Sequence, residues 1–184
     1  MRVISNDRDA IGIQRALKAR IPHSVIDHLK FKNRTDFEAR LNEELVSCSA
    51  ELVCLAGFMR LLTSRFVKKW HGRLVNIHPS LLPAFKGLDT HARALAAGVK
   101  IAGCTIHYVS QDMDAGPIIA QAAVPVMPND SEDILAARIL QQEHIIFPLA
   151  LKMIAEGRVK IKDGHVLFDE ISLDDSVIIS PRLN

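Results

Sequence analysis

The sequence predicts an α/β fold, in which an open, mostly parallel sheet carries helices on both faces. Three observations predict it. Segments with the two-residue period of strands alternate along the chain with segments of helical period. Residues 52–56 form a continuous apolar run, which is typical of a parallel strand covered on both faces. With 184 residues, 48% of them hydrophobic, the chain suits one α/β domain over 1–184 rather than two large ones.

The first third of the chain predicts strands and helices in alternation, over residues 2–5, 9–20, 24–26 and 36–48. Apolar residues at helical spacing carry the first helix, and Pro22 ends it. The second helix is expected to start at Thr35-Asp36-Phe37-Glu38, which has the form of a capping box. Its buried stripe is then Phe37, Leu41 and Leu45.

The centre of the chain, residues 74–87, predicts a strand that ends in an ordered loop. Asn76 and His78 are expected on one face of the strand, because successive side chains point to opposite faces. Pro79 ends the ladder, and Pro83 with Gly87 prevents a helix from following. Such a strand end is where an open α/β sheet usually binds its ligand.

The remaining elements follow the same alternation. Helices are expected over residues 63–70 and 91–97, strands over 101–109 and 117–126, and a hairpin over 159–168 that turns at Asp163-Gly164. The longest helix, 132–155, follows a capping cluster that ends at Ser131, bends at Pro148, and is expected to bury Ile134, Leu135, Ile139 and Leu140. The tail over 169–184 alternates weakly and is expected to be flexible.

Composition excludes several classes of function. The net charge of +2 and the lack of long Lys/Arg blocks argue against a nucleic-acid or anionic-membrane partner, and we expect no apolar run as long as a membrane span. Cys48, Cys54 and Cys104 have no Cys-x-x-Cys spacing, which favours free buried thiols in the reducing cytoplasm. No histidine pair has a metal-binding spacing, so we expect no metal.

Two sequence blocks carry a family resemblance. Asn76-Ile77-His78-Pro79-Ser80-Leu81-Leu82-Pro83 resembles the signature of the folate-dependent formyltransferases, and residues 86–91 continue it as in the members that formylate glycinamide ribonucleotide. Residues 103–109 with 112–119 match the same family, and the resemblance extends from about residue 3 to residue 157. It implies a Rossmann-like fold and a cytoplasmic enzyme of purine biosynthesis and one-carbon metabolism. Its expected substrates are glycinamide ribonucleotide and 10-formyltetrahydrofolate, without a metal.

The resemblance also implies roles for individual residues. Asn76, His78 and Asp114 are the expected catalytic residues. The expected contacts to the folate are made by Arg34, Met59, Arg60, Leu61, Leu62, Asn76 and Val109, and those to the ribonucleotide by Gly57, Pro79 and Glu143. The two arginines are expected near the acidic glutamate tail of the folate, because a guanidinium binds a carboxylate with two parallel hydrogen bonds. His107 is left open between a residue that supports the site and a core histidine.

Alternatives remain open. Formyltetrahydrofolate deformylase, a hydrolase, shares the Asn and His pattern, but such enzymes usually carry His where this chain has Pro79. A remnant that binds folate with weak or no activity is the other alternative. The oligomeric state is open, with a homo-oligomer among the choices. The family begins with a further strand, a Gly-rich phosphate loop and a helix, so we expect this chain to lack them and to lose ribonucleotide affinity and stability.

Overall fold

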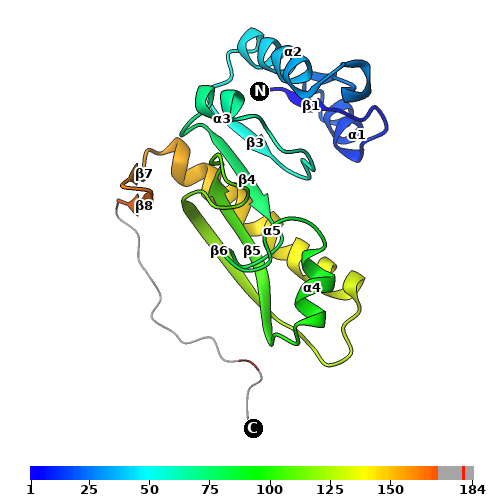
Figure 1. Cartoon of the computed structure of the whole chain (residues 1–184), viewed down its shortest axis with the longest axis vertical. Coiled ribbons are helices and arrows are strands. Elements are labelled where there is room, and N and C mark those ends of the chain that lie inside the picture. Colours follow the sequence, from blue (N-terminus) through cyan, green and yellow to red (C-terminus); the bar gives the residue numbers. More distant parts are fainter. Residues whose placement is uncertain (170–179, 181–184) are drawn as a thin grey trace. The chain divides into compact units, whose positions relative to one another are not determined.

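The computed structural model describes residues 1–169 and residue 180 (Figure 1). Helices and strands alternate along these residues, so the predicted α/β class is confirmed. Contacts divide the chain into two compact units, one of residues 1–53 with 60–70 and one of residues 54–59 with 71–184. Of the expected flexible tail, only Asp169 and Ser180 belong to the described residues.

The first unit combines a small parallel sheet with helices. Its elements are β1 (Val3–Ser5), α1 (Ile11–Lys18), β2 (His23–Val25), a 3-10 helix (His28–Lys30), α2 (Arg34–Ser47) and α3 (Ser64–Lys69). β1 pairs with β2 in parallel, and α1 buries Ile13 and Ala16. The predicted stripe of Phe37, Leu41 and Leu45 on α2 is confirmed as buried.

The predicted capping box of α2 is wrong. The N-cap is Asn33, whose side-chain oxygen accepts from the Asp36 N–H at 2.9 Å. Glu38 is only 4% exposed, and its carboxylate accepts from the backbone N–H of Thr63 at 2.7 Å and from the Thr63 hydroxyl. Because Thr63 is distant in sequence, a local pattern cannot show that Glu38 already has a partner.

The second unit is built on a sheet with the strand order β3-β4-β5-β6. These strands are β3 (Val53–Leu55), β4 (Leu74–His78), β5 (Ile101–Tyr108) and β6 (Ile118–Pro125). β4 pairs with β5, and β5 with β6, in antiparallel register. The expected mostly parallel pairing is therefore wrong for β4, β5 and β6. Because only a short loop over 109–117 joins β5 to β6, the second strand runs back antiparallel to the first. The two-residue period of a strand does not show in which direction its neighbour runs.

β3 lies at the edge of this sheet, and Cys54 at its centre is exposed. The expected cover on both faces is therefore absent at Cys54. Of the thiols expected to be buried, Cys104 is buried, Cys48 is half-buried and Cys54 is exposed. The prediction of free cysteines is consistent with these three thiols, whereas their burial is confirmed only for Cys104.

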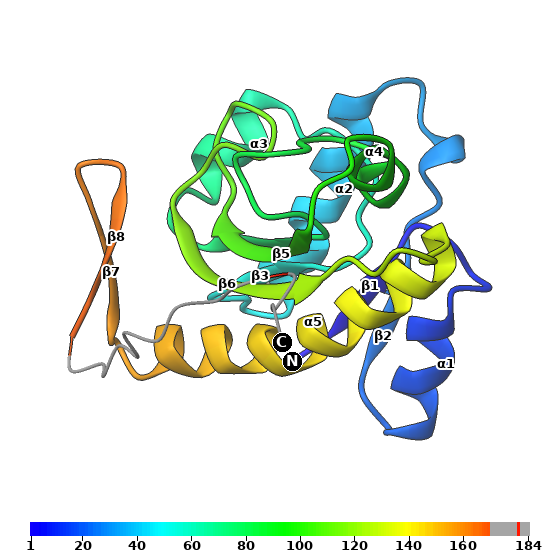
Figure 2. The ribbon, with the colours of Figure 1, turned by 90° about the horizontal axis from the view of Figure 1, so that it is seen from below.

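α5 (Glu132–Ala155) packs along β5 and β6 (Figure 2), while α4 (Thr90–Ala96) contacts α5. The face of α5 toward the sheet carries Leu135, Ile139, Ile146 and Ala150, spaced as on one side of a helix. Ile134 and Leu140 were expected to be buried but are 50% and 47% exposed. Each lies next to a buried residue in the sequence. Where apolar residues are adjacent, helical periodicity does not show which of them faces the core.

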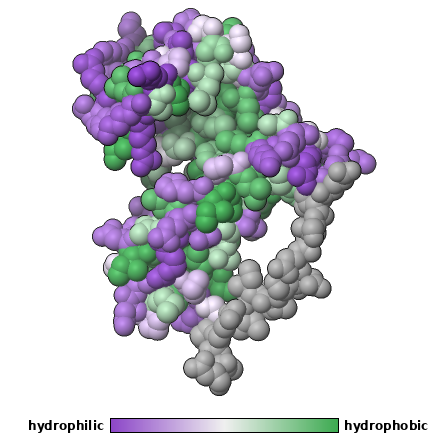
Figure 3. Space-filling view, turned by 180° about the vertical axis from the view of Figure 1, so that it is seen from behind, coloured by the Kyte–Doolittle hydropathy of each residue, from purple (hydrophilic) through white to green (hydrophobic). Residues whose placement is uncertain are grey.

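By length and composition alone, α5 is long and apolar enough to cross a membrane. The sequence was expected to contain no apolar run of that length. The apolar run is interrupted by Glu143 and Lys152, yet its mean hydropathy over 18 residues reaches 1.2. Core helices of soluble proteins can have the same length and composition. Figure 3, seen from the side opposite to Figure 1, shows apolar and polar surface interspersed on that face.

The last described elements are β7 (Val159–Lys162) and β8 (His165–Phe168), which form an antiparallel hairpin. Asp163 and Gly164 have φ values of 50° and 78° at its turn, which confirms the predicted Asp-Gly hairpin.

Candidate functional site

The antiparallel pairing of β4 and β5 brings two polar side chains together. Asn76 on β4 is opposite His107 on β5, and Asn76 Nδ2 lies 3.3 Å from His107 Nε2. On the other side of β5, the register with β6 shifts between Ile106 and His107. Such irregularities re-aim a side chain locally. The sheet thus places the two side chains in contact across the ladder.

His107 fixes the direction of the Asn76 amide. Its Nδ1 lies 2.9 Å from the Tyr108 carbonyl oxygen, which only accepts, so Nδ1 carries a proton. Burial, which outweighs the neighbouring carbonyl and Asp114, lowers the pKa of His107 and favours the neutral ring. Nε2 is then an acceptor, and Asn76 donates to it. One N–H of the Asn76 amide remains for another acceptor.

His78 lies between two acceptors. Its Nε2 is 3.0 Å from the Phe85 carbonyl oxygen, and its Nδ1 is 3.4 Å from Oδ2 of Asp114. An imidazolium donates from both ring nitrogens and therefore satisfies both neighbours. His78 is only 6% exposed, which strengthens the interaction with the carboxylate. The Phe85 carbonyl and the Asp114 carboxylate thus hold the His78 ring from both of its nitrogens.

Asp114 is held in the loop between β5 and β6, as the sequence predicts. Its Oδ2 accepts from the Gly87 backbone N–H at 2.8 Å, and its Oδ1 lies 3.8 Å from His107 Nε2. Asp114 has a φ of 47°, in the left-handed region. Gly116 tightens the same loop, since a Cβ there would lie 1.8 Å from the Tyr108 oxygen. The carboxylate therefore has a fixed place next to both histidines.

A buried hydroxyl holds the loop that follows β4. Thr105 is fully buried, donates to the Ser80 carbonyl at 2.7 Å and accepts from the Leu82 N–H at 3.0 Å. The Gln121 amide donates to Thr105 Oγ1 and to the Leu82 carbonyl, both at 3.0 Å. Sequence reasoning assigned neither residue to the site. The sequence did hold one indication for Thr105, because it is two residues from His107 and therefore lies on the same face of the strand.

A small apolar cavity of about 160 Å³ lies beside this loop. Pro79, expected to contact substrate, lines it together with Phe85, Ala94, Ile139 and His91. The Nε2 atom of His91 is buried without a partner among the described residues, and burial lowers the pKa of this ring. The lining thus suits an apolar group rather than an ion.

Glu143 and Val109 also lie in the second unit. Burial raises the pKa of the Glu143 carboxyl, and burial likewise raises that of the Cys104 thiol to about 12, with Glu143 adding to the effect. Val109 donates its backbone N–H to the Leu74 carbonyl at 2.8 Å. No contact of the described residues joins the Glu143 side chain to Asn76, His78 or Asp114. Its predicted role toward substrate stays a prediction.

Five residues expected to contact the folate, and Gly57, expected to contact the ribonucleotide, are divided between the two units. Gly57, with a φ of 62°, and Met59, 74% exposed, belong to the second unit, whereas Arg34, Arg60, Leu61 and Leu62 belong to the first. The Arg60 guanidinium lies over the Phe37 ring at 5.6 Å, and its buried Nε has no partner within the described part of the chain. The roles of these six residues remain predictions. Within residues 1–169 and 180, no cluster of three or more His, Cys, Asp or Glu could hold a metal.

Comparisons with known proteins give the relatives of this chain. Residues 1–151 match the family described as formyl transferase. The chain is 50% identical over 162 residues to the trifunctional purine biosynthetic protein adenosine-3 of Bos taurus, covering 88% of this chain and 16% of that protein. It therefore spans about a sixth of that relative's length.

Two further comparisons cover most of both chains. The phosphoribosylglycinamide formyltransferase of Haemophilus influenzae is 41% identical over 174 residues, which are 95% of this chain and 82% of that protein. The crystal structure of glycinamide ribonucleotide transformylase 1 from Symbiobacterium toebii superposes with a TM-score of 0.89 at 46% identity. That match covers 92% of this chain and 80% of the other.

Proposed function

Because the chain belongs to the formyl transferase family, we propose that it transfers the formyl group of 10-formyltetrahydrofolate to the amine of glycinamide ribonucleotide. The observation that carries the proposal is the group of Asn76, His78 and Asp114, in which an amide with a spare N–H lies beside a histidine–carboxylate pair. The donor and acceptor named here are substrates, and the chemistry needs no metal. The free thiols support a reducing location such as the cytoplasm.

In the proposed reaction, the amine nitrogen attacks the formyl carbon, and the carbonyl oxygen becomes negative in a tetrahedral intermediate. The remaining N–H of Asn76 donates to this oxygen, and His78 stabilises the negative charge when its ring is protonated. The carbon–nitrogen bond to the folate then breaks. The proton lost by the attacking amine ends on the folate nitrogen, with Asp114 and water as carriers. No covalent intermediate with the protein forms.

The test measures formyl transfer by purified protein with both substrates. Asn76→Ala is expected to lower kcat by roughly a hundredfold to a thousandfold, because one donor to a developing oxyanion contributes about 3 to 4 kcal/mol. Asn129→Ala, which removes an exposed amide from the turn before α5, is the matched control and is expected to leave kcat unchanged. Normal turnover by a folded Asn76→Ala protein would contradict the proposal.

The same assay separates the alternatives. Release of formate from the folate without glycinamide ribonucleotide would indicate a deformylase. Folate binding without either reaction would indicate a remnant that binds but does not react. Transfer that requires the ribonucleotide supports the proposed function.

A further inference from the structure

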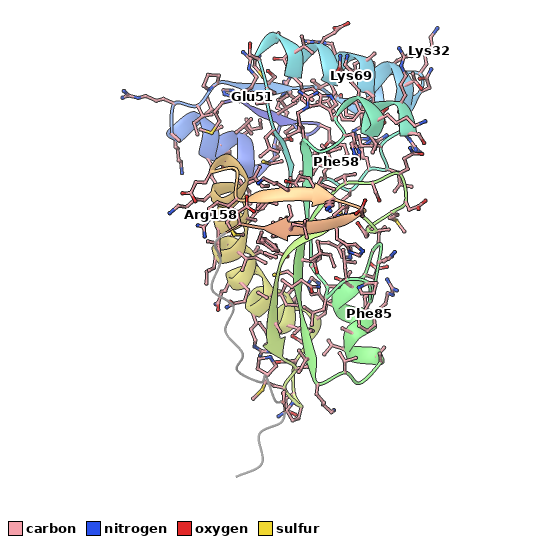
Figure 4. The ribbon with its side chains drawn as sticks, turned by 90° about the vertical axis from the view of Figure 1, so that its left-hand side faces the viewer. Lys32, Glu51, Phe58, Lys69, Phe85 and Arg158 are labelled. Atoms are coloured by element: carbon pink, nitrogen blue, oxygen red, sulfur yellow. The ribbon has the colours of Figure 1, made fainter. Side chains whose placement is uncertain are left out.

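Residues 85–89 supply two backbone groups to the site. The Phe85 carbonyl accepts from His78 Nε2, and the Gly87 N–H donates to Asp114 Oδ2. Both groups come from one short loop between β4 and α4, and Figure 4 shows Phe85 beside α4. The mutual placement of His78 and Asp114 therefore depends on the conformation of this loop.

That conformation is not one the loop adopts by itself. Phe85, Gly87 and Asp89 have φ values of 52°, 80° and 55°, so two non-glycine residues lie in the left-handed region. Such residues persist only where surrounding contacts fix them. Asp89 precedes α4, but its side chain makes no capping hydrogen bond. The loop needs a contact from outside its own backbone.

Arg93, one turn into α4, provides such contacts. Its Nη1 donates to the Lys86 carbonyl at 2.6 Å and to the Leu88 carbonyl at 3.1 Å. Its guanidinium also covers the Phe85 ring, 5.7 Å from the centroid. The two carbonyls flank Gly87, whose N–H binds Asp114. One side chain thus holds the loop on both sides of the group that fixes the carboxylate.

We propose that Arg93 is a positioning residue for the formyl-transfer reaction, acting through the loop over 85–89 on Asp114 and His78. The inference rests on the proposed function for its kinetic consequence, whereas its structural consequence can be measured in the resting protein. Arg93 is exposed, so its loss removes little of the buried core. Its effect is therefore expected in the site rather than in the stability of the fold.

The first measurement is amide hydrogen exchange at Gly87 in the full chain by NMR. Arg93→Gln is expected to speed that exchange at least about tenfold, because the loop opens more often. Lys100→Gln removes another exposed charge of the second unit and is expected to leave Gly87 exchange unchanged. Equal Gly87 exchange in the wild-type and Arg93→Gln proteins would overturn the proposal whatever the activity.

The second measurement is steady-state formyl transfer. Arg93→Gln is expected to lower kcat by roughly tenfold to a hundredfold, as for a small misplacement of reacting groups, with both KM values and Tm almost unchanged. Arg93→Lys keeps a donor for the carbonyls and is expected to recover part of kcat. A drop in Tm that accounts for the loss, or a kcat equal to or above that of the wild type, would overturn the proposal.

A double-mutant cycle with Asp114→Asn then tests the route. Since Arg93 is proposed to act through Asp114 and His78, Arg93→Gln is expected to cost much less in the Asp114→Asn background than in the wild type. Fully additive effects would overturn the proposal. A wild-type protein that transfers no formyl group, but whose Gly87 exchange responds to Arg93→Gln, would contradict the proposed function while leaving the loop contact established.

Discussion

A single neutral histidine decides how the Asn76 amide faces the site. Because the Tyr108 carbonyl accepts a hydrogen bond from Nδ1–H of His107, Nε2 of the neutral ring can only accept, and the amide must present its NH2 group. A charged His107 would instead donate from Nε2 and turn the amide oxygen toward itself. The lowered pKa of His107 is thus part of how the donor for the proposed oxyanion is set.

The first prediction concerns this histidine. His107→Phe keeps a planar ring but offers no acceptor to Asn76, so the amide loses its fixed direction. We expect kcat for formyl transfer to fall by roughly tenfold or more, with smaller changes in KM. The measurement is steady-state kinetics together with Tm. A variant that folds and turns over normally would show that the amide does not need His107.

At the scale of the element, the pairing of β5 and β6 has no room at Gly103. A Cβ there would lie 2.0 Å from the Ala122 oxygen and 2.9 Å from a Leu81 methyl group. Because the first of these neighbours is backbone, it cannot rotate away. The pairing that positions both Thr105 and His107 therefore requires glycine at this position.

Gly103→Ala is the second prediction. We expect it to destabilise the fold by about 3 kcal/mol or more, since overpacking against backbone separates two strands. The matched control is Gly12→Ala in α1, where a Cβ meets nothing within 4 Å. That change is expected to stabilise by about 0.5 to 1 kcal/mol, because alanine has the higher helix propensity. Denaturant unfolding of both variants checks the pair, and similar effects of the two changes would refute the packing argument.

The start of α5 is joined to the preceding turn by an ion pair. Asp130, whose side chain is 3% exposed, accepts from Arg138 at 2.6 Å and from the Met127 N–H at 2.8 Å. The hydrogen bond from Arg138, and then that from Met127, lowers the pKa of Asp130 from 3.8 to about 2. A carboxyl with a lowered pKa stabilises the fold above its ordinary pKa and loses that contribution as the pH falls through the lowered value.

The third prediction follows from the lowered pKa of Asp130. Asp130→Asn is expected to lower Tm at pH 7, and the difference from the wild type is expected to shrink as the pH falls from about 4 to about 2. Asp133→Asn, in the exposed first turn of α5, is the control. The measurement is Tm against pH for the three proteins. A difference that grew toward low pH would contradict the assigned ion pair.

At the scale of the whole molecule, periodicity predicted the order of the helices and strands well. Residues 132–155 and the hairpin turn at Asp163-Gly164 were predicted correctly because their signals are local: a capping serine, a long apolar stripe and a turn dipeptide. The direction of β5 and β6 could not be predicted that way. The relative direction of two paired strands depends on the connection between them, and the alternation of residues within a strand carries no information about that connection.

In the candidate site, too, the residues with a local sequence signal were predicted and the residues that act through tertiary contacts were not. Asn76, His78 and Asp114 were named from two sequence blocks, and the structure brings them together. The residues that hold them were missed, because Thr105, Gln121 and Arg93 bind backbone groups of the loop after β4 rather than the side chains of Asn76, His78 or Asp114. Hydrogen bonds to backbone leave no constraint on the partner's residue type, so no pattern marks them. The expectation about an upstream phosphate loop stays a prediction.

The fourth prediction concerns the folate. If Arg60 binds the acidic tail, far from the reacting carbon, Arg60→Ala is expected to raise KM for 10-formyltetrahydrofolate roughly tenfold, with kcat nearly unchanged, because one charge-assisted hydrogen bond contributes about 1.5 to 3 kcal/mol. Arg65→Ala, an exposed arginine on α3, is the control. The measurement is steady-state kinetics of both variants at varied concentrations of 10-formyltetrahydrofolate. A loss of kcat without a change in KM would place Arg60 in the chemistry instead.

The Asp163-Gly164 turn offers a place where the chain can be lengthened. β7 and β8 pair only with each other among the strands of the described residues, and their turn residues are exposed. Exposed turns of this kind tolerate inserted residues, because few contacts depend on their length. A short peptide tag or a fluorophore attached there would report on the protein in solution or hold it on a surface without altering the sheet that carries Asn76 and His107.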